Sequence, residues 1–130
     1  MCDFLSLDDA LYIHKRQLDR FGGGDGMRDE GLLLSALEMP QSGFEDKYFH
    51  GFPYEMAAAY LFHIVKNHPF VDGNKRTGFA CAHAFLKLNG YNLEVSSEQV
   101  IDLVLQVATG QLTKDNVSAM LQSWSVPYDE

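Results

Sequence analysis

Near the middle of the chain, one short segment combines a titratable base, a carboxylate, an amide and two cations, and it reads His68-Pro69-Phe70-Val71-Asp72-Gly73-Asn74-Lys75-Arg76-Thr77. Imidazole changes its charge close to neutral pH, so His68 can accept a proton from an attacking hydroxyl. Asp72 can hold Mg²⁺, a hard cation that prefers oxygen ligands and often bridges phosphates. A base and a metal ligand placed this close together are typical of a site that transfers phosphoryl groups.

The residues after Asp72 form a pattern that can bind an anion. Gly73 lets the backbone turn tightly, and a helix that begins near Asn74 or Lys75 offers free N–H groups and the positive end of its dipole. Lys75 and Arg76 add full positive charges, and the guanidinium of Arg76 can donate two hydrogen bonds to one phosphate. The sequence therefore predicts a phosphate-binding turn directly beside the base and the metal ligand.

Each of these residues also has a plainer interpretation. A lone histidine in a loop is more often structural than catalytic, but the residues around His68 favour catalysis. Asp72 could cap the following helix, with or without binding a metal. Asn74 could be only a turn residue. Lys75 could be a solvated lysine at a helix end, and Arg76 could pair with surface carboxylates.

Composition limits the class of protein. The chain has 130 residues, 46% of them hydrophobic, which suits one folded domain spanning residues 1–130. The formal net charge of −8 argues against general nucleic-acid binding. The longest apolar stretch, 56–65, is too short to span a membrane, and residues 1–11 show no signal peptide. Two distant cysteines, Cys2 and Cys81, form no disulfide framework, so we expect a cytoplasmic protein.

Apolar residues recur at helical spacing along most of the chain. Helix breakers and the caps Ser6, Asp29, Ser96 or Ser97, and Thr113 add to this spacing. Together they predict six helices: 7–21, 30 to Pro40, 54–67, 75 or 77 to 89, 97 or 98 to Gly110, and 114 to Pro127. Residues 91–95 are expected to be extended, and 41–52 to be a long loop. The fold class is thus a compact all-α bundle with the active-site loop between two central helices.

The central segment resembles the signature of the Fic/Doc (Fido) superfamily, His-x-Phe-x-(Asp/Glu)-Gly-Asn-x-Arg. It is most similar to the Doc branch, because Lys75 stands where nucleotide-transferring Fic enzymes usually have glycine. Similar stretches cover nearly the whole chain: 13–18, 21–23, 26–33, 35–37 with Pro40, 85–91 and 108–110. The Doc branch consists of death-on-curing toxins from type II toxin–antitoxin modules.

The resemblance implies a Fido fold and a protein kinase that transfers the γ-phosphate of ATP, with Mg²⁺, to a Ser/Thr hydroxyl of a translation factor. The implied target is elongation factor Tu, and the implied outcome is arrest of translation and growth. By position in the motif, His68 would be the base and Asp72 the Mg²⁺ ligand, with phosphate binding by Gly73, Asn74, Lys75 and Arg76. Phe70 would anchor the loop in the core.

Two departures from the Fic pattern favour kinase activity: Lys75 replaces the usual glycine, and Phe79 stands where a second arginine is expected. No Ser or Thr is followed four residues later by Glu, so the internal inhibitory motif of some Fic proteins is absent. Inhibition would then come from a separate, Phd-like antitoxin that folds as a helix in a groove. Two alternatives remain: a nucleotidyltransferase of the AMPylation type, or a catalytically idle domain that binds a partner.

Some features have no role assigned from the sequence. His14, Arg28 and Asp29 match the resemblance without a known chemistry, although Asp29 is a natural helix cap. The loop 41–52 could be a flap that pairs with an extended segment of the target, or a plain surface loop.

Overall fold

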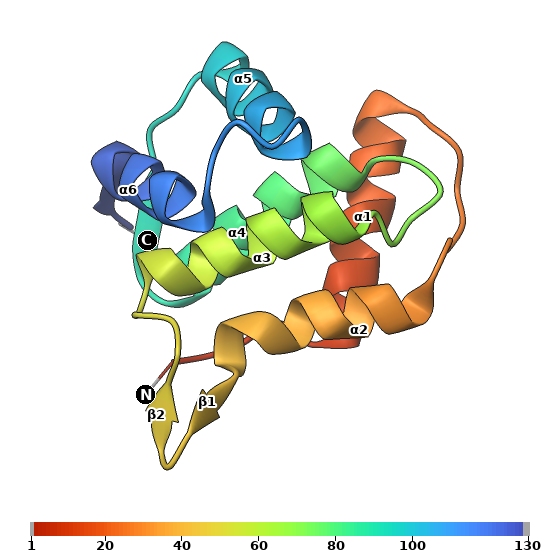
Figure 1. The fold of residues 1–130 in the computed structure, drawn as a ribbon. Helices are drawn as coiled ribbons and strands as arrows, with labels where there is room; N and C mark the ends of the chain where they lie inside the picture. Colours follow the sequence, from red (N-terminus) through yellow and green to blue (C-terminus); the bar gives the residue numbers. More distant parts are fainter. Residues whose placement is uncertain (1, 129–130) are drawn as a thin grey trace.

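Two helices joined by the signature loop, α3 (Tyr54–Asn67) and α4 (Asn74–Leu88), lie side by side at the centre of the molecule (Figure 1). The computed structural model describes residues 2–128. Gly78 of α4 allows the close approach, since a Cβ there would lie 2.9 Å from Val65 Cγ2 and 3.1 Å from the carbonyl oxygen of Leu61. The signature loop is therefore fixed at both ends to a tightly packed pair of helices.

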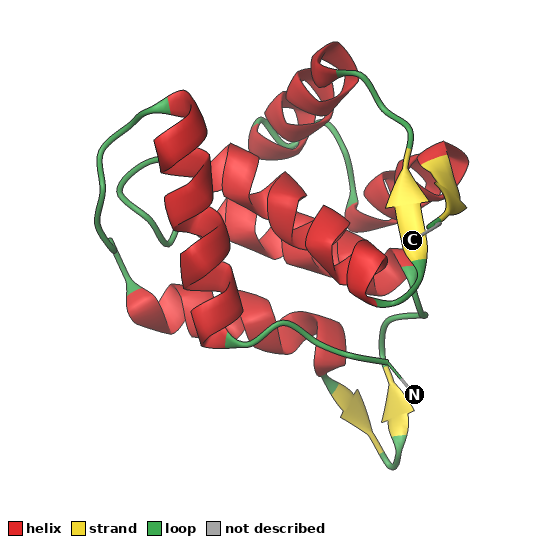
Figure 2. Cartoon of the chain, turned by 180° about the vertical axis from the view of Figure 1, so that it is seen from behind, coloured by secondary structure: helices red, strands yellow, loops and turns green. Residues whose placement is uncertain are grey.

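Four more helices surround this pair: α1 (Leu7–Phe21), α2 (Glu30–Glu38), α5 (Ser97–Ala108) and α6 (Lys114–Trp124). Helix α1 packs against α4, α2 and α6 pack against α3, and α5 contacts both central helices (Figures 1 and 2). The all-α architecture with a loop between two central helices confirms the fold class predicted from the sequence.

Most helix starts are stabilised by the side chains that the sequence indicated. Ser6, Ser96 and Thr113 each begin a helix, and each accepts a hydrogen bond from the backbone N–H three residues later. The carboxylate of Asp29 accepts from Leu32 N at 3.1 Å and caps α2 in the same way. These local contacts explain why the helix starts could be placed from sequence.

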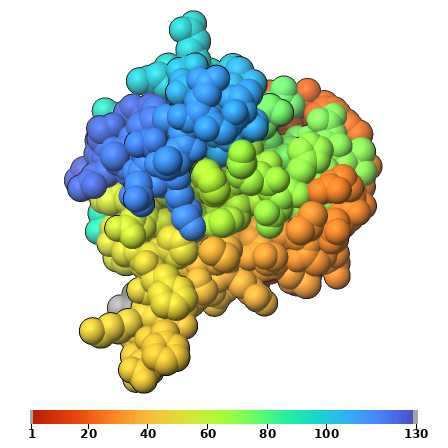
Figure 3. All heavy atoms as spheres, viewed as in Figure 1, coloured from red at the N-terminus to blue at the C-terminus, as the bar shows by residue number. Residues whose placement is uncertain are grey.

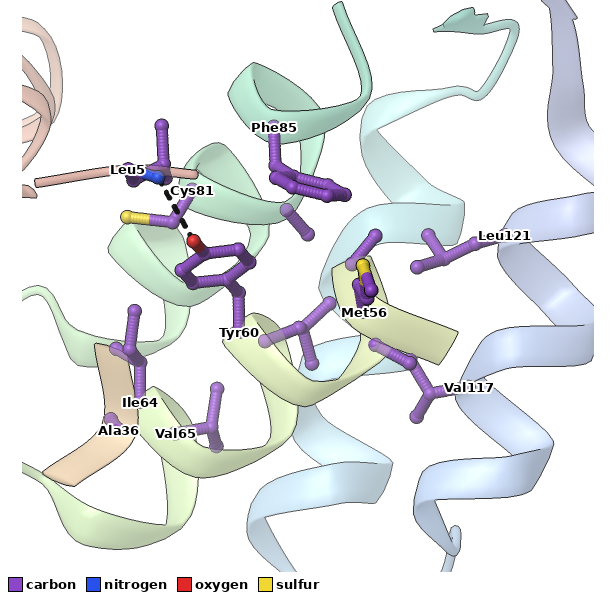
Figure 4. Packing of buried hydrophobic residues seen from close by; sticks show 14 of the residues in the cluster. Leu5, Ala36, Met56, Tyr60, Ile64, Val65, Cys81, Phe85, Val117 and Leu121 are labelled. Atoms are coloured by element: carbon purple, nitrogen blue, oxygen red, sulfur yellow. Dashed lines mark hydrogen bonds between the residues drawn. The ribbon is translucent and has the colours of Figure 1, made fainter. Parts of the chain in front are cut away.

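The core lies between α3, α4 and the helices on either side of them (Figure 4). Tyr60 is fully buried there, and its hydroxyl accepts a hydrogen bond of 2.9 Å from Leu5 N, which fastens the N-terminal segment to α3. Burial raises the pKa of this tyrosine to about 12. Cys81 is also completely buried, and desolvation raises the pKa of its thiol to about 12, as expected for a structural cysteine.

The sequence predicted extended backbone at 91–95, but not that this segment pairs with a second strand. Strand β3 (Tyr91–Leu93) pairs antiparallel with β4 (Ser125–Pro127), so the last helix ends at Trp124 and not at Pro127. The amide of Glu94 donates to the carbonyl of Trp124 at 2.8 Å, which extends this pairing. Extended backbone at 125–127 satisfies hydrogen bonds of β3 that another helical turn would leave unpaired.

The predicted loop 41–52 contains the end of a 3₁₀ turn, η1 (Met39–Gln41), followed by a hairpin of β1 (Gly43–Phe44) and β2 (Lys47–Tyr48). The hairpin projects from the end of the molecule where α3 begins, whereas the signature loop follows the other end of α3 (Figures 1 and 3). This position favours the surface-loop interpretation over a flap beside His68. Within residues 2–128, no helix has the length and apolarity needed to cross a membrane.

Candidate active site

His68 is the C-cap of α3 and adopts a left-handed backbone conformation, with φ 52° and ψ 54°. Its amide still donates to the carbonyl of Ile64 at 3.1 Å, so the chain leaves the helix at this residue. The side chain is exposed and lines a pocket of about 340 Å³. The other lining residues are Asp72, Gly73, Asn74, Lys75, Arg76, Ile101, Val104 and Leu105. The predicted base and the residues that follow it therefore share one cavity.

The carboxylate of Asp72 is fixed by two backbone amides. Gly73 N donates to Oδ1 at 2.8 Å, and Gly24 N donates to Oδ2 at 3.2 Å. These hydrogen bonds are the main reason that the pKa of Asp72 lies below its usual value, and the charges of Arg76 and Lys75 lower it further. Asp72 is thus ionised at neutral pH.

Magnesium fits this carboxylate. Each oxygen of Asp72 accepts one amide hydrogen and keeps further lone pairs for a cation. Within residues 2–128, no group of three or more His, Cys, Asp or Glu side chains converges to hold a metal. A cation here would share its ligands with a bound phosphate and water, which is the usual way that proteins hold Mg²⁺.

The side-chain amide of Asn74 is used within the signature loop. The residue is buried, its Oδ1 accepts from Phe70 N at 2.9 Å, and its Nδ2 donates to Phe70 O at 3.0 Å. Both polar groups of the side-chain amide are thus hydrogen-bonded to the backbone of Phe70, within the signature loop. The backbone N–H of Asn74, at the start of α4, is available to contact a phosphate.

The first turn of α4 carries the positive charge of the pocket. Gly73 caps the helix with φ 79° and no side chain caps the free N–H groups of its first turn. Lys75 and Arg76 are both exposed beside it. The guanidinium of Arg76 lies 4.8 Å from the ring centre of Phe21, so it bends toward α1. This turn can bind an anion through backbone amides and two cations together.

Phe70 and His14 pack against each other and support the signature loop. Phe70 is buried, and its ring stacks on the imidazole of His14 with centroids 3.7 Å apart and planes 6° apart. His14 Nε2 lies 2.8 Å from the carbonyl oxygen of Asp72 and must donate, because a carbonyl only accepts. The histidine of α1 that lacked a role in the sequence therefore supports the backbone of Asp72.

The segment between α1 and α2 runs antiparallel to the signature loop, with a β-bridge between Met27 and Phe70. Val71 N donates to Gly26 O at 3.0 Å, and the amides of Arg28 and Asp29 both donate to Pro69 O, at 2.8 and 2.9 Å. The whole signature loop is thus held by backbone hydrogen bonds to a second loop that is about 40 residues away in sequence.

This pocket can accept a proton at His68, bind a divalent cation at Asp72 and bind phosphate at the start of α4. Comparison with known proteins identifies the family. Residues 4–86 match the model of the Fic/DOC family. The chain belongs to the Fic/DOC family.

Three relatives extend the comparison. The chain is 36% identical to "Toxin Doc" of Mycolicibacterium smegmatis over 96% of its own length and 95% of that protein. It is 29% identical to "Protein kinase doc" of Escherichia phage P1, over 91% and 92%. It is 31% identical to "Protein adenylyltransferase Fic" of Aedes aegypti, over 68% of this chain and 21% of that protein.

The Fic/DOC signature pocket also has an apolar wall that the sequence did not reveal. Ile101, Val104 and Leu105 of α5 line it, and Ile101 and Leu105 are about half exposed. The signal available in the sequence was that Ile101 and Leu105 lie four residues apart on one face of an amphipathic helix. If that helix only packed against the core, there would be no reason for both side chains to be exposed.

A larger groove of about 540 Å³ adjoins the Fic/DOC pocket at Arg76 and Ile101, between α1, α4 and α5. Phe21, Phe79 and Val100 supply apolar surface there. Phe79 lies in this groove with its ring 5.7 Å from that of His83. The position where Fic enzymes are expected to carry a second arginine thus presents an aromatic ring to the groove.

Proposed function

We propose that this chain is a Doc-type toxin that transfers the γ-phosphate of ATP to a Ser or Thr hydroxyl of a protein involved in translation. The observation that carries the proposal is the first turn of α4, where Lys75 and Arg76 lie with Asp72 and His68 around one pocket. The names of the phage P1 and Mycolicibacterium smegmatis relatives support kinase activity and a toxin role. By family resemblance, the target is elongation factor Tu.

In this reaction the hydroxyl oxygen of the target forms a bond to the γ-phosphorus, and the bond to the β–γ bridging oxygen breaks to release ADP. His68 takes the hydroxyl proton. Lys75, Arg76 and the backbone amide of Asn74 bind the phosphates and balance their charge, whereas the amide of Gly73 already donates to Asp72. Asp72 would hold Mg²⁺, which neutralises phosphate charge when bound.

Lys75 and Phe79 favour phosphate transfer over nucleotide transfer. An ammonium at position 75 adds a point charge where Fic enzymes offer only a glycine backbone. Phe79 cannot bind a phosphate, so the grip expected on the β- and γ-phosphates of a nucleotidyl donor is missing. Both differences favour an ATP that presents its γ-phosphate to the hydroxyl.

The groove between α1, α4 and α5 suits an antitoxin segment that binds as an amphipathic helix. Its apolar residues can receive the apolar face of such a helix. Arg20 and Arg76 also line the groove, which favours acidic side chains at the edge of the bound helix. A helix bound there would contact Arg76 and so interfere with the phosphate site.

Nucleotidyl transfer is the second candidate, supported by the similarity to the Aedes aegypti adenylyltransferase. The same base and the same phosphate-binding turn could direct the α-phosphate to the hydroxyl. A catalytically idle binding domain is the third candidate, but it gives no reason for an ionised Asp72 beside two cations in an open pocket.

The test is growth arrest after induced expression without an antitoxin. His68→Ala and Asp72→Asn should abolish growth arrest, because the first removes the base and the second removes the charge that attracts a divalent cation. Asp19→Asn, at an exposed site on α1, is the matched control and should arrest growth like the wild type. If the His68 and Asp72 variants arrest growth as fast as the wild type, the protein acts by binding and the enzymatic proposal fails.

A further inference from the structure

The backbone that carries His68 is held by one arginine of the α1–α2 segment. Arg28 Nε donates to the carbonyl oxygen of His68 at 2.6 Å, and Arg28 Nη2 donates to that of Asn67 at 2.8 Å. The backbone amide of the same residue donates to Pro69 O at 2.8 Å. Residue 28 therefore binds three consecutive carbonyls, at 67, 68 and 69.

These hydrogen bonds fall at a residue whose backbone conformation is unfavourable. His68 has φ 52° and ψ 54°, a left-handed conformation that residues with a side chain seldom adopt. Within residues 2–128, no hydrogen bond to its imidazole is present, although the ring lines the pocket. The direction of the imidazole therefore depends on the backbone at 68, since no hydrogen bond to the ring fixes it.

The guanidinium has the right shape for this task. Its planar fork donates two hydrogen bonds at a fixed angle, and the acceptors are the last carbonyls of α3, at the negative end of the helix dipole. Lysine would supply the same charge, but its ammonium lacks the fixed planar geometry of the guanidinium. Arg28 is exposed and belongs to no part of the apolar core.

We propose that Arg28 is a positioning residue for the base: its guanidinium holds the backbone at 67–68 in the conformation that directs the imidazole of His68 into the pocket. This inference rests on the proposed function, in which His68 takes the proton of the target hydroxyl. It assigns Arg28 no contact with ATP or target.

The first arm measures transfer of the γ-phosphate from labelled ATP to the target protein in a bacterial lysate. Arg28→Ala should lower kcat at least about tenfold, since a small misplacement of a reacting group has a large effect on rate. The KM for ATP should change less than about threefold, because phosphate binding at α4 is intact. The kcat of Arg28→Lys should lie between that of the wild type and that of Arg28→Ala. Arg16→Ala, at an exposed arginine on α1, is the matched control and should match the wild type.

Chemical rescue separates positioning from a general loss of structure. Added guanidinium, kept well below denaturing concentrations, should raise the rate of Arg28→Ala several-fold, and ammonium should not. The Arg28→Ala chain keeps its backbone N–H and therefore its bond to Pro69 O, so the loop remains attached. Full activity in Arg28→Ala, or a loss that appears in KM alone, would overturn the inference.

The second arm needs no substrate and so stands apart from the proposed function. In backbone NMR spectra, Arg28→Ala should shift or broaden the signals of residues 67–72 and leave those of α5 and α6 unchanged. Unchanged loop signals would overturn the inference even if the wild type transferred nothing. If Arg28→Ala alters the loop signals but the wild type transfers no phosphate, the role of Arg28 in holding the loop stands. Only the kinase proposal is then refuted.

Discussion

Lys75 and Phe79 are the two side chains of α4 that distinguish this pocket from the Fic pattern of nucleotide transfer. They lie one helical turn apart, on the stretch where the phosphate pocket meets the groove beside it. A cation at the first position and an aromatic ring at the second would change which phosphate of ATP faces the hydroxyl. In the proposed function, the reaction type therefore depends on these two residues and not on the fold.

Exchanging both residues should change the bond that breaks. In the double variant Lys75→Gly, Phe79→Arg, the restored arginine can bind the β- and γ-phosphates, so we expect transfer of α-label from ATP to appear and γ-label transfer to fall at least about tenfold. Mass spectrometry of the modified protein would show the added group. Lys87→Gly is the control for a lysine lost elsewhere on α4. A double variant that still transfers only γ-label would mean that donor choice is set outside these two positions.

At the scale of elements, the close approach of the α1–α2 segment to the signature loop depends on glycine. Gly23 has φ 122°, and a Cβ there would lie 2.8 Å from Asp72 Oδ2. Gly22 also has a positive φ, 80°, but a Cβ there would meet nothing within 4 Å. The two neighbours share a backbone conformation that disfavours side chains and differ in their contact with Asp72.

Gly23→Ala should therefore reduce phosphate transfer at least about tenfold, because the carboxylate is displaced from its place beside the pocket. Gly22→Ala should lose stability, about 1 kcal/mol, and keep its transfer rate. Urea unfolding and the transfer assay measure the two effects separately. Equal loss of activity in both variants would show that backbone strain matters and the contact with Asp72 does not.

A second cluster joins three elements away from the pocket. Lys114 Nζ of α6 lies 2.9 Å from His50 Nε2 and 3.0 Å from His63 Nε2, so it donates to two neutral imidazoles. Burial, aided by the charge of Lys114 and by His50, lowers the pKa of His63 to about 4. Burial also lowers the pKa of His50, while Glu55 and Asp115 act in the opposite direction. The cluster thus requires unprotonated histidines.

Stability should consequently fall at acid pH. The folded pKa of His63 lies below its unfolded value of 6.5, so its contribution is complete above about pH 6.5 and is lost as the pH falls toward 4. After allowance for the partial exposure of the ring, we expect a loss of roughly 1–2 kcal/mol. Urea unfolding of the wild type and of His63→Gln at about pH 7.5 and about pH 4.5 measures it. The variant should be less sensitive to pH, and equal sensitivity would contradict the assignment.

For the whole molecule, the groove between α1, α4 and α5, where we propose that the antitoxin binds, is only partly shared with the pocket at His68. Val100 of α5 is half-buried, lines the groove and is not part of the phosphate pocket. Arg76 and Ile101 border both cavities. If the antitoxin binds there as a helix, a substitution at Val100 can weaken its binding without altering the residues proposed to bind ATP.

Val100→Glu should remain toxic and resist neutralisation by the antitoxin encoded with this chain. A buried carboxylate would oppose the apolar face of the bound helix, and we expect affinity to fall at least about tenfold. Co-expression growth assays and titration calorimetry would test this. Glu98→Gln, on the exposed start of the same helix, is the control and should be neutralised normally. Normal neutralisation of Val100→Glu would place the antitoxin elsewhere.

The sequence predicted the parts of the molecule whose signals are local. The caps Ser6 and Thr113, the apolar spacing of the helices and the nine-residue signature all lie within a few positions of the elements that they define. The hairpin at 43–48 and the pairing of β3 with β4 escaped, because two- and three-residue strands depend on partners and carry little pattern of their own.

Contacts between residues that are far apart in the sequence were also not predicted. Arg28 reaches the carbonyl of His68 across 40 positions, and His14 reaches that of Asp72 across 58, so no spacing in a single sequence connects them. The amide of Asn74 closes the loop on Phe70, which only the backbone geometry of the loop makes visible. That the signature residues belong to one site was thus predictable, while the contacts that hold their backbone in place were not.

The most direct test of the account uses the purified chain, free of antitoxin, with Mg²⁺, a bacterial lysate, and ATP labelled separately on the α- and γ-phosphates. The account predicts that γ-label alone passes to a single protein, that His68→Ala abolishes the transfer, and that the target gains the mass of one phosphate. Transfer of α-label, with the added mass of a nucleotide monophosphate, would contradict it and replace the kinase with a nucleotidyltransferase.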